Sequence, residues 1–117
     1  MCTITTHVLD SALGMPAAGV PVALLRDGEQ VAAAVTNADG RTGQLGPAGL
    51  PPGRYALVFD TGAYFAAAGR AAFYPEVTIC FEAAGFKTAD PGGAAGEPHY
   101  HVPLLLSPFG YTTYRGS

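Results

Sequence analysis

The sequence lacks several features that would assign it to a well-defined class of protein. It has no tryptophan, only two cysteines and only six lysine and arginine residues among 117. Charged residues make up 13% of the chain, and the formal net charge is −3. Because nucleic-acid binding needs clustered basic side chains opposite the phosphates, these scattered ones argue against a nucleic-acid partner. No apolar run approaches the roughly 20 residues that span a bilayer, so we expect no membrane contact.

The cysteines and the first residues bear on the cellular compartment. Cys2 and Cys80 have neither the spacing of metal ligands nor that of a disulfide framework. Residues 1–6 contain neither the basic nor the apolar segment of a signal peptide. Isolated thiols are typical of a reducing environment, so we expect a cytoplasmic protein. A single disulfide between the two cysteines stays open as an alternative.

The chain does contain enough apolar material for a core. Hydrophobic residues make up 49% of it, and a length of 117 residues fits one compact unit. We therefore expect a single domain over residues 1–117. The low charge also suggests that part of the surface is covered by other subunits.

Short apolar runs separated by glycine and proline dominate the sequence. Asp27-Gly28 predicts a primed two-residue hairpin turn, and residues 37–40 predict a second turn before Arg41. One helix is expected over residues 61–70, with Thr61 as its cap. This pattern predicts an all-β fold, an antiparallel sandwich of two sheets with about eight strands and one short helix. The strands are expected at residues 4–9, 20–25, 30–36, 54–59, 75–81, 99–106 and 111–115, with a further short segment beginning at residue 41.

Polar side chains collect on one predicted strand face. Alternation along residues 99–106 places His99 and His101 opposite the core-facing residues. The same rule places His7 on the outer face of the first strand and Tyr114 on that of the last. If these strands share a sheet, three imidazoles and a phenol form one surface. That surface is too polar for a core and too apolar for ordinary solvated surface, so we expect a pocket or a subunit interface.

Two chemistries could use three histidines. Histidines at alternate strand positions with a third nearby can hold zinc with an open position for water. Metal-free acid–base catalysis is the other, because imidazole titrates near neutral pH. Taken singly, each histidine, and Arg41 after its turn, is more often a structural or solvated residue. The residues by themselves leave these alternatives open.

Four segments together resemble the 5-hydroxyisourate hydrolases, transthyretin-related enzymes of urate breakdown. The resemblance covers nearly the whole chain, and its most specific part is the C-terminal tetrapeptide. The segments are THVLD at residues 6–10, NADGR at 37–41, HYHVPLLLSP at 99–108 and YRGS at 114–117.

The resemblance implies a transthyretin-like sandwich, a homotetramer with sites in channels between subunits, and no cofactor or metal. It implies hydrolysis of 5-hydroxyisourate to 2-oxo-4-hydroxy-4-carboxy-5-ureidoimidazoline, a cyclic amide ring opening. Arg115 is expected to support the tail. The implied catalytic residues are His7, Arg41, His99 and Ser117, and the implied substrate-binding residues are His7, Arg41, His101 and Tyr114.

Two other functions remain to be weighed. One is a transthyretin-like carrier that binds a small aromatic ligand without chemistry. In transthyretin, the positions aligned with His7, Arg41 and Tyr114 hold lysine, glutamate and threonine, which line its hormone channel, so the resemblance favours the enzyme. The other is a zinc hydrolase that uses all three histidines.

Overall fold

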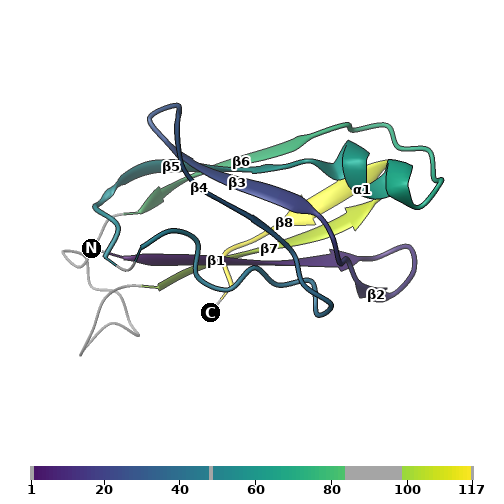
Figure 1. Cartoon of the computed structure of the whole chain (residues 1–117), viewed down its shortest axis with the longest axis horizontal. Helices are drawn as coiled ribbons and strands as arrows, with labels where there is room; N and C mark the ends of the chain where they lie inside the picture. The colour runs from purple at the N-terminus through teal and green to yellow at the C-terminus, as the bar shows by residue number, and fades with distance from the viewer. Residues whose placement is uncertain (1, 48, 84–98, 117) are drawn as a thin grey trace.

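Two four-stranded sheets lie face to face in the computed structural model of this chain, which describes residues 2–47, 49–83 and 99–116 (Figure 1). Ser117 and the loop predicted at residues 87–96 lie outside the described residues. The elements are β1 (Thr3–Asp10), β2 (Met15–Pro16), β3 (Pro21–Arg26), β4 (Glu29–Val35), β5 (Gly53–Phe59), α1 (Thr61–Ala67), β6 (Val77–Ala83), β7 (His99–Ser107) and β8 (Gly110–Thr113). The sheet orders are β2-β1-β7-β8 and β4-β3-β5-β6.

The core lies between the two sheets and follows the predicted alternation. Every second residue of β1 is buried, and the residues between them are partly exposed. In β7, Tyr100, Val102, Leu104 and Leu106 face the core, which leaves His99 and His101 on the outside as predicted. Burying a large apolar side chain stabilises the fold by roughly 1.5–3 kcal/mol. Slipping either strand by one residue would therefore be costly, and the outward histidines are held in place by their inward neighbours.

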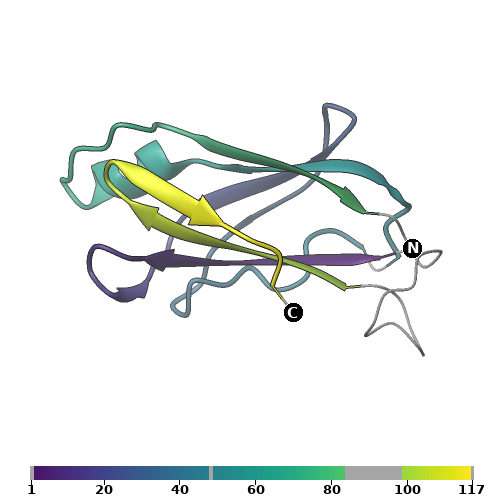
Figure 2. The same ribbon diagram turned by 180° about the vertical axis from the view of Figure 1, so that it is seen from behind.

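One strand pair departs from the predicted antiparallel arrangement. β1 and β7 run parallel, with Thr5 opposite His101, whereas the other pairs of named strands are antiparallel. Thr3 and His99, which are also opposite each other, lie 96 residues apart in the sequence. The chain crosses the second sheet between them, so no hairpin forces antiparallel pairing. Figure 2 shows β7 and β8 beside β1, with the chain returning past β7 after β8.

Three local predictions also need correction. Residues 15–16 were predicted to lie in a break but form β2, which pairs with the end of β1. The segment from Arg41 is not a continuous strand; isolated bridges attach it to the free edge of β1. Asp60, not Thr61, caps α1, because its carboxylate accepts a hydrogen bond from the Ala63 amide while the Thr61 hydroxyl donates to the Tyr74 carbonyl.

The helix α1 is also shorter than predicted and ends at Ala67. In the described part of the chain, no helix has both the length and the hydrophobicity needed to cross a bilayer.

Candidate active site

A tight turn brings Arg41 to the edge of β1. The Asn37 side-chain oxygen accepts hydrogen bonds from the Asp39 and Arg41 amides, at 2.9 and 3.1 Å. Gly40 has φ of +76°, and a Cβ there would lie 2.3 Å from the Val8 carbonyl oxygen. Only glycine permits this approach, which lets the Gly40 carbonyl accept from the Val8 amide at 2.7 Å. The turn therefore fixes the position of the Arg41 backbone beside β1.

Arg41 and His7 form an isolated antiparallel bridge. Residues directly opposite each other in a sheet project to the same face, so both side chains lie on the outer face of the first sheet. The His7 Nε2 lies 2.9 Å from the carbonyl oxygen of Asp39. Because a carbonyl only accepts, the neutral ring carries its hydrogen on Nε2. The basic nitrogen of His7 is then Nδ1.

His101 lies next to His7 on the same face. Their ring centroids are 6.5 Å apart, and the His99 and His101 rings are nearly parallel with centroids 6.4 Å apart. Register explains this order, since His7 is opposite Pro103 and Thr5 is opposite His101. The three predicted histidines are therefore brought together by β1 and β7.

Threonine hydroxyls occupy three of the imidazole nitrogens. The Thr5 Oγ1 lies 3.0 Å from Nε2 of His99 and 2.8 Å from Nδ1 of His101. The Thr3 Oγ1 lies 2.7 Å from Nδ1 of His99. Both nitrogens of His99 are thus occupied, whereas Nε2 of His101 has no hydrogen-bond partner among residues 2–47, 49–83 and 99–116. No role was predicted for Thr3 or Thr5, although strand alternation places both on the same face of β1 as His7.

The C-terminal segment crosses the edge of His101. The Gly116 amide donates to the His101 carbonyl at 2.8 Å. A Cβ at Gly116 would lie 2.7 Å from Cδ2 of His101 and 3.2 Å from Cγ of Pro103, so only a residue without a side chain fits. The register between the Leu104–Thr113 pair and this bridge places Tyr114 opposite Pro103, on the histidine face.

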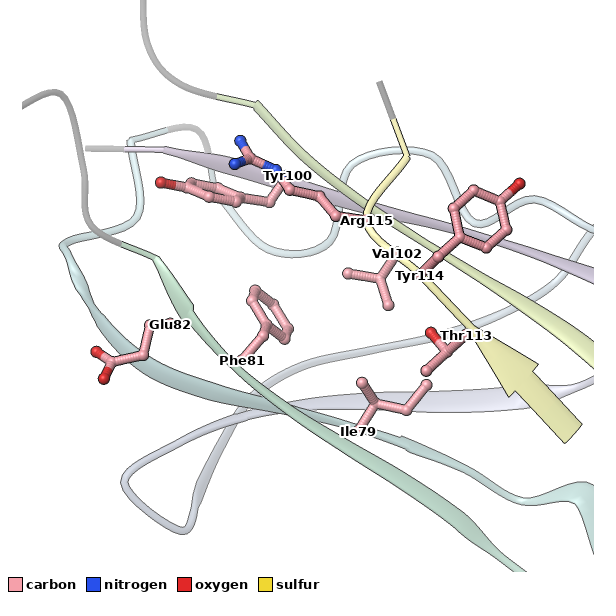
Figure 3. A pocket seen from close by; sticks show the side chains of 8 residues that line it. All are labelled: Ile79, Phe81, Glu82, Tyr100, Val102, Thr113, Tyr114 and Arg115. Carbon is pink, nitrogen blue, oxygen red and sulfur yellow. The ribbon is translucent and has the colours of Figure 1, made fainter. Parts of the chain in front are cut away.

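Arg115 faces the other way. Its guanidinium carbon lies 4.8 Å from the ring centroid of Tyr100, a residue of the core. Both residues line a cavity of about 270 Å³, and Figure 3 shows Phe81 facing this cavity while the Tyr114 ring points away from Phe81. Tyr114 also lines this pocket, whereas none of the three histidines does. Arg115 therefore lies on the core side of the C-terminal segment, away from the histidines.

The electrostatic surroundings favour a neutral His101. Burial lowers the pKa of His101, and the positive charge of Arg41 and the neighbouring imidazoles His99 and His7 lower it further. A histidine that stays unprotonated at neutral pH can accept a proton. In the described ranges, no three histidine, cysteine or acidic side chains are placed to hold a metal ion.

The expected site residues thus fall into three groups. His7, Arg41, His99 and His101 share one outer face. Tyr114 reaches the edge of that face by register and is exposed, and Ser117 lies outside the described residues.

Comparison with known proteins identifies the family. A model of the HIUase/Transthyretin family matches residues 4–116. The chain belongs to this family. It is 43% identical to 5-hydroxyisourate hydrolase of Pseudomonas aeruginosa, and the match covers 100% of this chain and 93% of that protein.

Two solved structures represent the two branches that the family name joins. Klebsiella pneumoniae 5-hydroxyisourate hydrolase matches with a TM-score of 0.85 and 44% identity, covering 100% of this chain and 94% of that one. Sea bream transthyretin in complex with thyroxine matches with a TM-score of 0.80 and 34% identity, covering 97% and 93%. The predicted transthyretin-like fold is confirmed. The fold accommodates both proteins, so the site residues must separate an enzyme from a carrier.

Proposed function

We propose that this protein is a 5-hydroxyisourate hydrolase, a cyclic amidase that opens the six-membered ring of its substrate by adding water to a lactam carbonyl. The product is 2-oxo-4-hydroxy-4-carboxy-5-ureidoimidazoline, an intermediate of urate degradation. The observation that carries the proposal is the Arg41–His7 bridge beside His101. It joins a permanent cation to two proton acceptors on one face, as hydrolysis needs and a passive carrier does not.

His7 and His101 supply the base. The neutral rings have their free nitrogens at Nδ1 of His7, set by the Asp39 carbonyl, and at Nε2 of His101. A water held between these nitrogens loses a proton as its oxygen attacks the carbonyl carbon. A positioned general base of this kind accelerates a reaction by roughly 10²–10⁴-fold. His99, with both nitrogens occupied by hydroxyls, acts through His101 rather than on the water.

Arg41 binds the substrate and stabilises the transition state. Its planar guanidinium is always charged and offers paired donors to the oxygens of an electron-rich heterocycle. The same donors stabilise the negative charge that develops on the carbonyl oxygen during attack. Tyr114, at the edge of the face, binds the ring of the substrate, and Ser117 at the chain end takes part in closing the site.

A homotetramer would complete the site. On the single chain the histidine face is open, and exposed aromatic residues follow β7, notably Phe109 and Tyr111. We propose that four copies assemble so that this face lines a channel between subunits, which keeps bulk water, but not the attacking water, away from the bound ring. Light scattering coupled to size-exclusion chromatography tests the assembly. Cys2 and Cys80 form no disulfide in the described part of the chain, which fits the proposed cytoplasmic location.

The decisive experiment follows the decay of freshly generated 5-hydroxyisourate by absorbance. The protein is expected to accelerate the decay, and dialysis against a chelator is expected to leave the rate unchanged. A carrier would bind a small aromatic ligand such as thyroxine without accelerating the decay. A zinc hydrolase would lose its activity on chelation and regain it with added zinc.

A further inference from the structure

Four side chains on the histidine face form one continuous chain of hydrogen bonds. In order they are Thr3, His99, Thr5 and His101, linked by distances of 2.7, 3.0 and 2.8 Å. This series of hydrogen bonds runs from Thr3, beside the exposed His99, to Nδ1 of the half-buried His101. The proposed reaction itself requires only the other nitrogen, Nε2.

The hydroxyl of Thr5 couples the protonation of the two rings. It has one hydrogen, so it donates to one imidazole and must accept from the other. If His101 donates through Nδ1, then Thr5 donates to Nε2 of His99 and the Nε2 of His101 is free as a base. If the hydrogen bonds run in the opposite direction, His101 carries its hydrogen on Nε2, and that nitrogen is a hydrogen-bond donor that cannot accept a proton from water. Both arrangements satisfy every group in the chain.

We propose that Thr5 is a positioning residue that sets the tautomer of His101 and relays a proton between His101 and His99. This inference rests on the proposed hydrolase function. It accounts for two observations that the function leaves unused: the double occupation of His99, and a threonine placed between two imidazoles.

The proton balance of the relay is complete. As water attacks, its proton moves to Nε2 of His101, while the Nδ1 proton of His101 moves to the Thr5 oxygen. The original hydroxyl proton of Thr5 moves to Nε2 of His99, so Thr5 is unchanged and the positive charge rests on His99. The reverse transfer restores the proton to His101. His101 then gives it to the ring nitrogen released when the lactam C–N bond breaks.

The charges around His101 give the relay a physical reason. Arg41 from the segment after β4, His7 from β1 and His99 from β7 all lower the pKa of His101, in addition to its burial. An imidazolium at that position is therefore disfavoured. His99 is exposed, so water solvates a positive charge there better than one on His101. Moving the charge outward keeps His101 neutral close to Arg41.

The test removes the hydroxyl while keeping the shape of the side chain. Thr5→Val is expected to lower kcat by roughly 10- to 100-fold, with little change in KM. This is at or below the lower end of the roughly 10²–10⁴-fold range of acid–base catalysis, because Thr5 acts through His101 and is not itself the base. Thr5→Ser retains the hydroxyl and is expected to recover most of that loss. Thr78→Val, the same change on the outer face of β6, is the matched control and should leave kcat unchanged. Thermal unfolding of all three variants checks that they fold.

Nitrogen-15 NMR of the free protein tests the relay without relying on turnover. In the wild type, titration of His99 is expected to change the Nδ1 and Nε2 shifts of His101, and Thr5→Val should abolish this coupling. If Thr5→Val keeps the wild-type kcat and the coupling, or if Thr5→Ser is as impaired as Thr5→Val, the relay is overturned. Absence of wild-type hydrolysis with intact NMR coupling would instead remove the proposed function and leave the coupled pair.

Discussion

The outer faces of the two four-stranded sheets differ in chemistry. On the first sheet, register aligns Thr5 with His101, and His7 with Arg41 and Pro103. On the second, the outward positions include small uncharged residues, with Ala23 opposite Val58 and Ala56 opposite Cys80. Both inner faces are mostly apolar and bury the core, although the buried residues of β1 include Thr6 and Asp10. The fold therefore supplies two outer sheet faces, and the outward residues of the first, placed by the parallel β1–β7 pair, are the ones suited to act on a substrate.

The first prediction removes the main groups of the histidine face. His7→Ala and Arg41→Gln should each reduce kcat/KM for 5-hydroxyisourate by about 10²–10⁴-fold, because each deletes a proposed base or the oxyanion donor. Thr78→Ala, on the other outer face, should keep wild-type kinetics. Steady-state assays on proteins of matched oligomeric state make the comparison. Full activity of either site variant would contradict its assigned role.

The second prediction concerns a buried polar group of the same strand. Asp10 accepts hydrogen bonds from Arg70 at 2.6 Å and from Tyr64 at 2.7 Å. Burial opposes ionisation of Asp10, but these bonds outweigh it and hold its pKa below the usual 3.8. Asp10→Asn should lower the free energy of unfolding by about 2–3 kcal/mol, less than for a fully buried pair because Arg70 is partly exposed.

The stabilisation from Asp10 is expected to depend on pH in a definite direction. Since the folded pKa is depressed, the stabilisation is present above pH 3.8 and is lost as the pH falls through the folded pKa. Denaturant unfolding of Asp10→Asn should lack this acid-dependent part, whereas Asp27→Asn at an exposed turn should resemble the wild type. An Asp10→Asn protein as stable as the wild type at pH 7 would show that the cluster does not stabilise the fold.

The third prediction alters the contact between the tail and His101. Gly116→Ala places a methyl group where 2.7 Å separates it from the ring, so the ring or the tail must move. We expect kcat/KM to fall by roughly 10-fold, about 1.4 kcal/mol, with little loss of stability. Gly110→Ala is the matched control, because its Cβ would meet nothing closer than 3.8 Å. Equal activity of the two variants would show that the contact between Gly116 and His101 does not contribute to catalysis.

The smallest expected effect is on the titration of His101. Its NMR titration midpoint should lie below 6.5 and rise towards that value in Arg41→Gln, which removes one of the charges that depress it. Because the pKa of His101 is lower in the folded protein than in the unfolded chain, the unfolded chain binds this proton more readily. The free energy of unfolding should therefore decline as the pH falls below 6.5. A midpoint at or above 6.5 in the wild type would contradict the proposed neutral base.

Strand alternation explains how much of this could be predicted. A period of two assigns His99 and His101 outwards whatever the neighbouring strand is, and positive φ at both Asp27 and Gly28 matches the predicted primed turn. Alternation does not say which strand lies alongside or in which direction. The parallel pairing of β1 with β7, and with it the Thr5–His101 contact, depends on packing between residues far apart in the sequence.

The residues that share the histidine face could be predicted from the sequence, but the hydrogen bonds between them could not. His7 is bridged to Arg41, and the rings of His7 and His101 lie side by side. The division of roles between His99 and His101 depends on threonine hydroxyls that lie 2.7–3.0 Å from the imidazole nitrogens, and no spacing in the sequence encodes these contacts. The cap of α1 shows the same limit, since Asp60 and Thr61 are both good capping residues and tertiary contact with Tyr74 decides between them.

The most direct test measures the decay of freshly generated 5-hydroxyisourate in the presence of each of three proteins: the wild type, His101→Ala and Thr78→Ala. The account predicts that the wild type and Thr78→Ala accelerate the decay equally and that His101→Ala brings it close to the spontaneous rate. If His101→Ala accelerated the decay as much as the wild type does, or if the wild type did not accelerate it at all, the claim that the histidine face carries out hydrolysis would be contradicted.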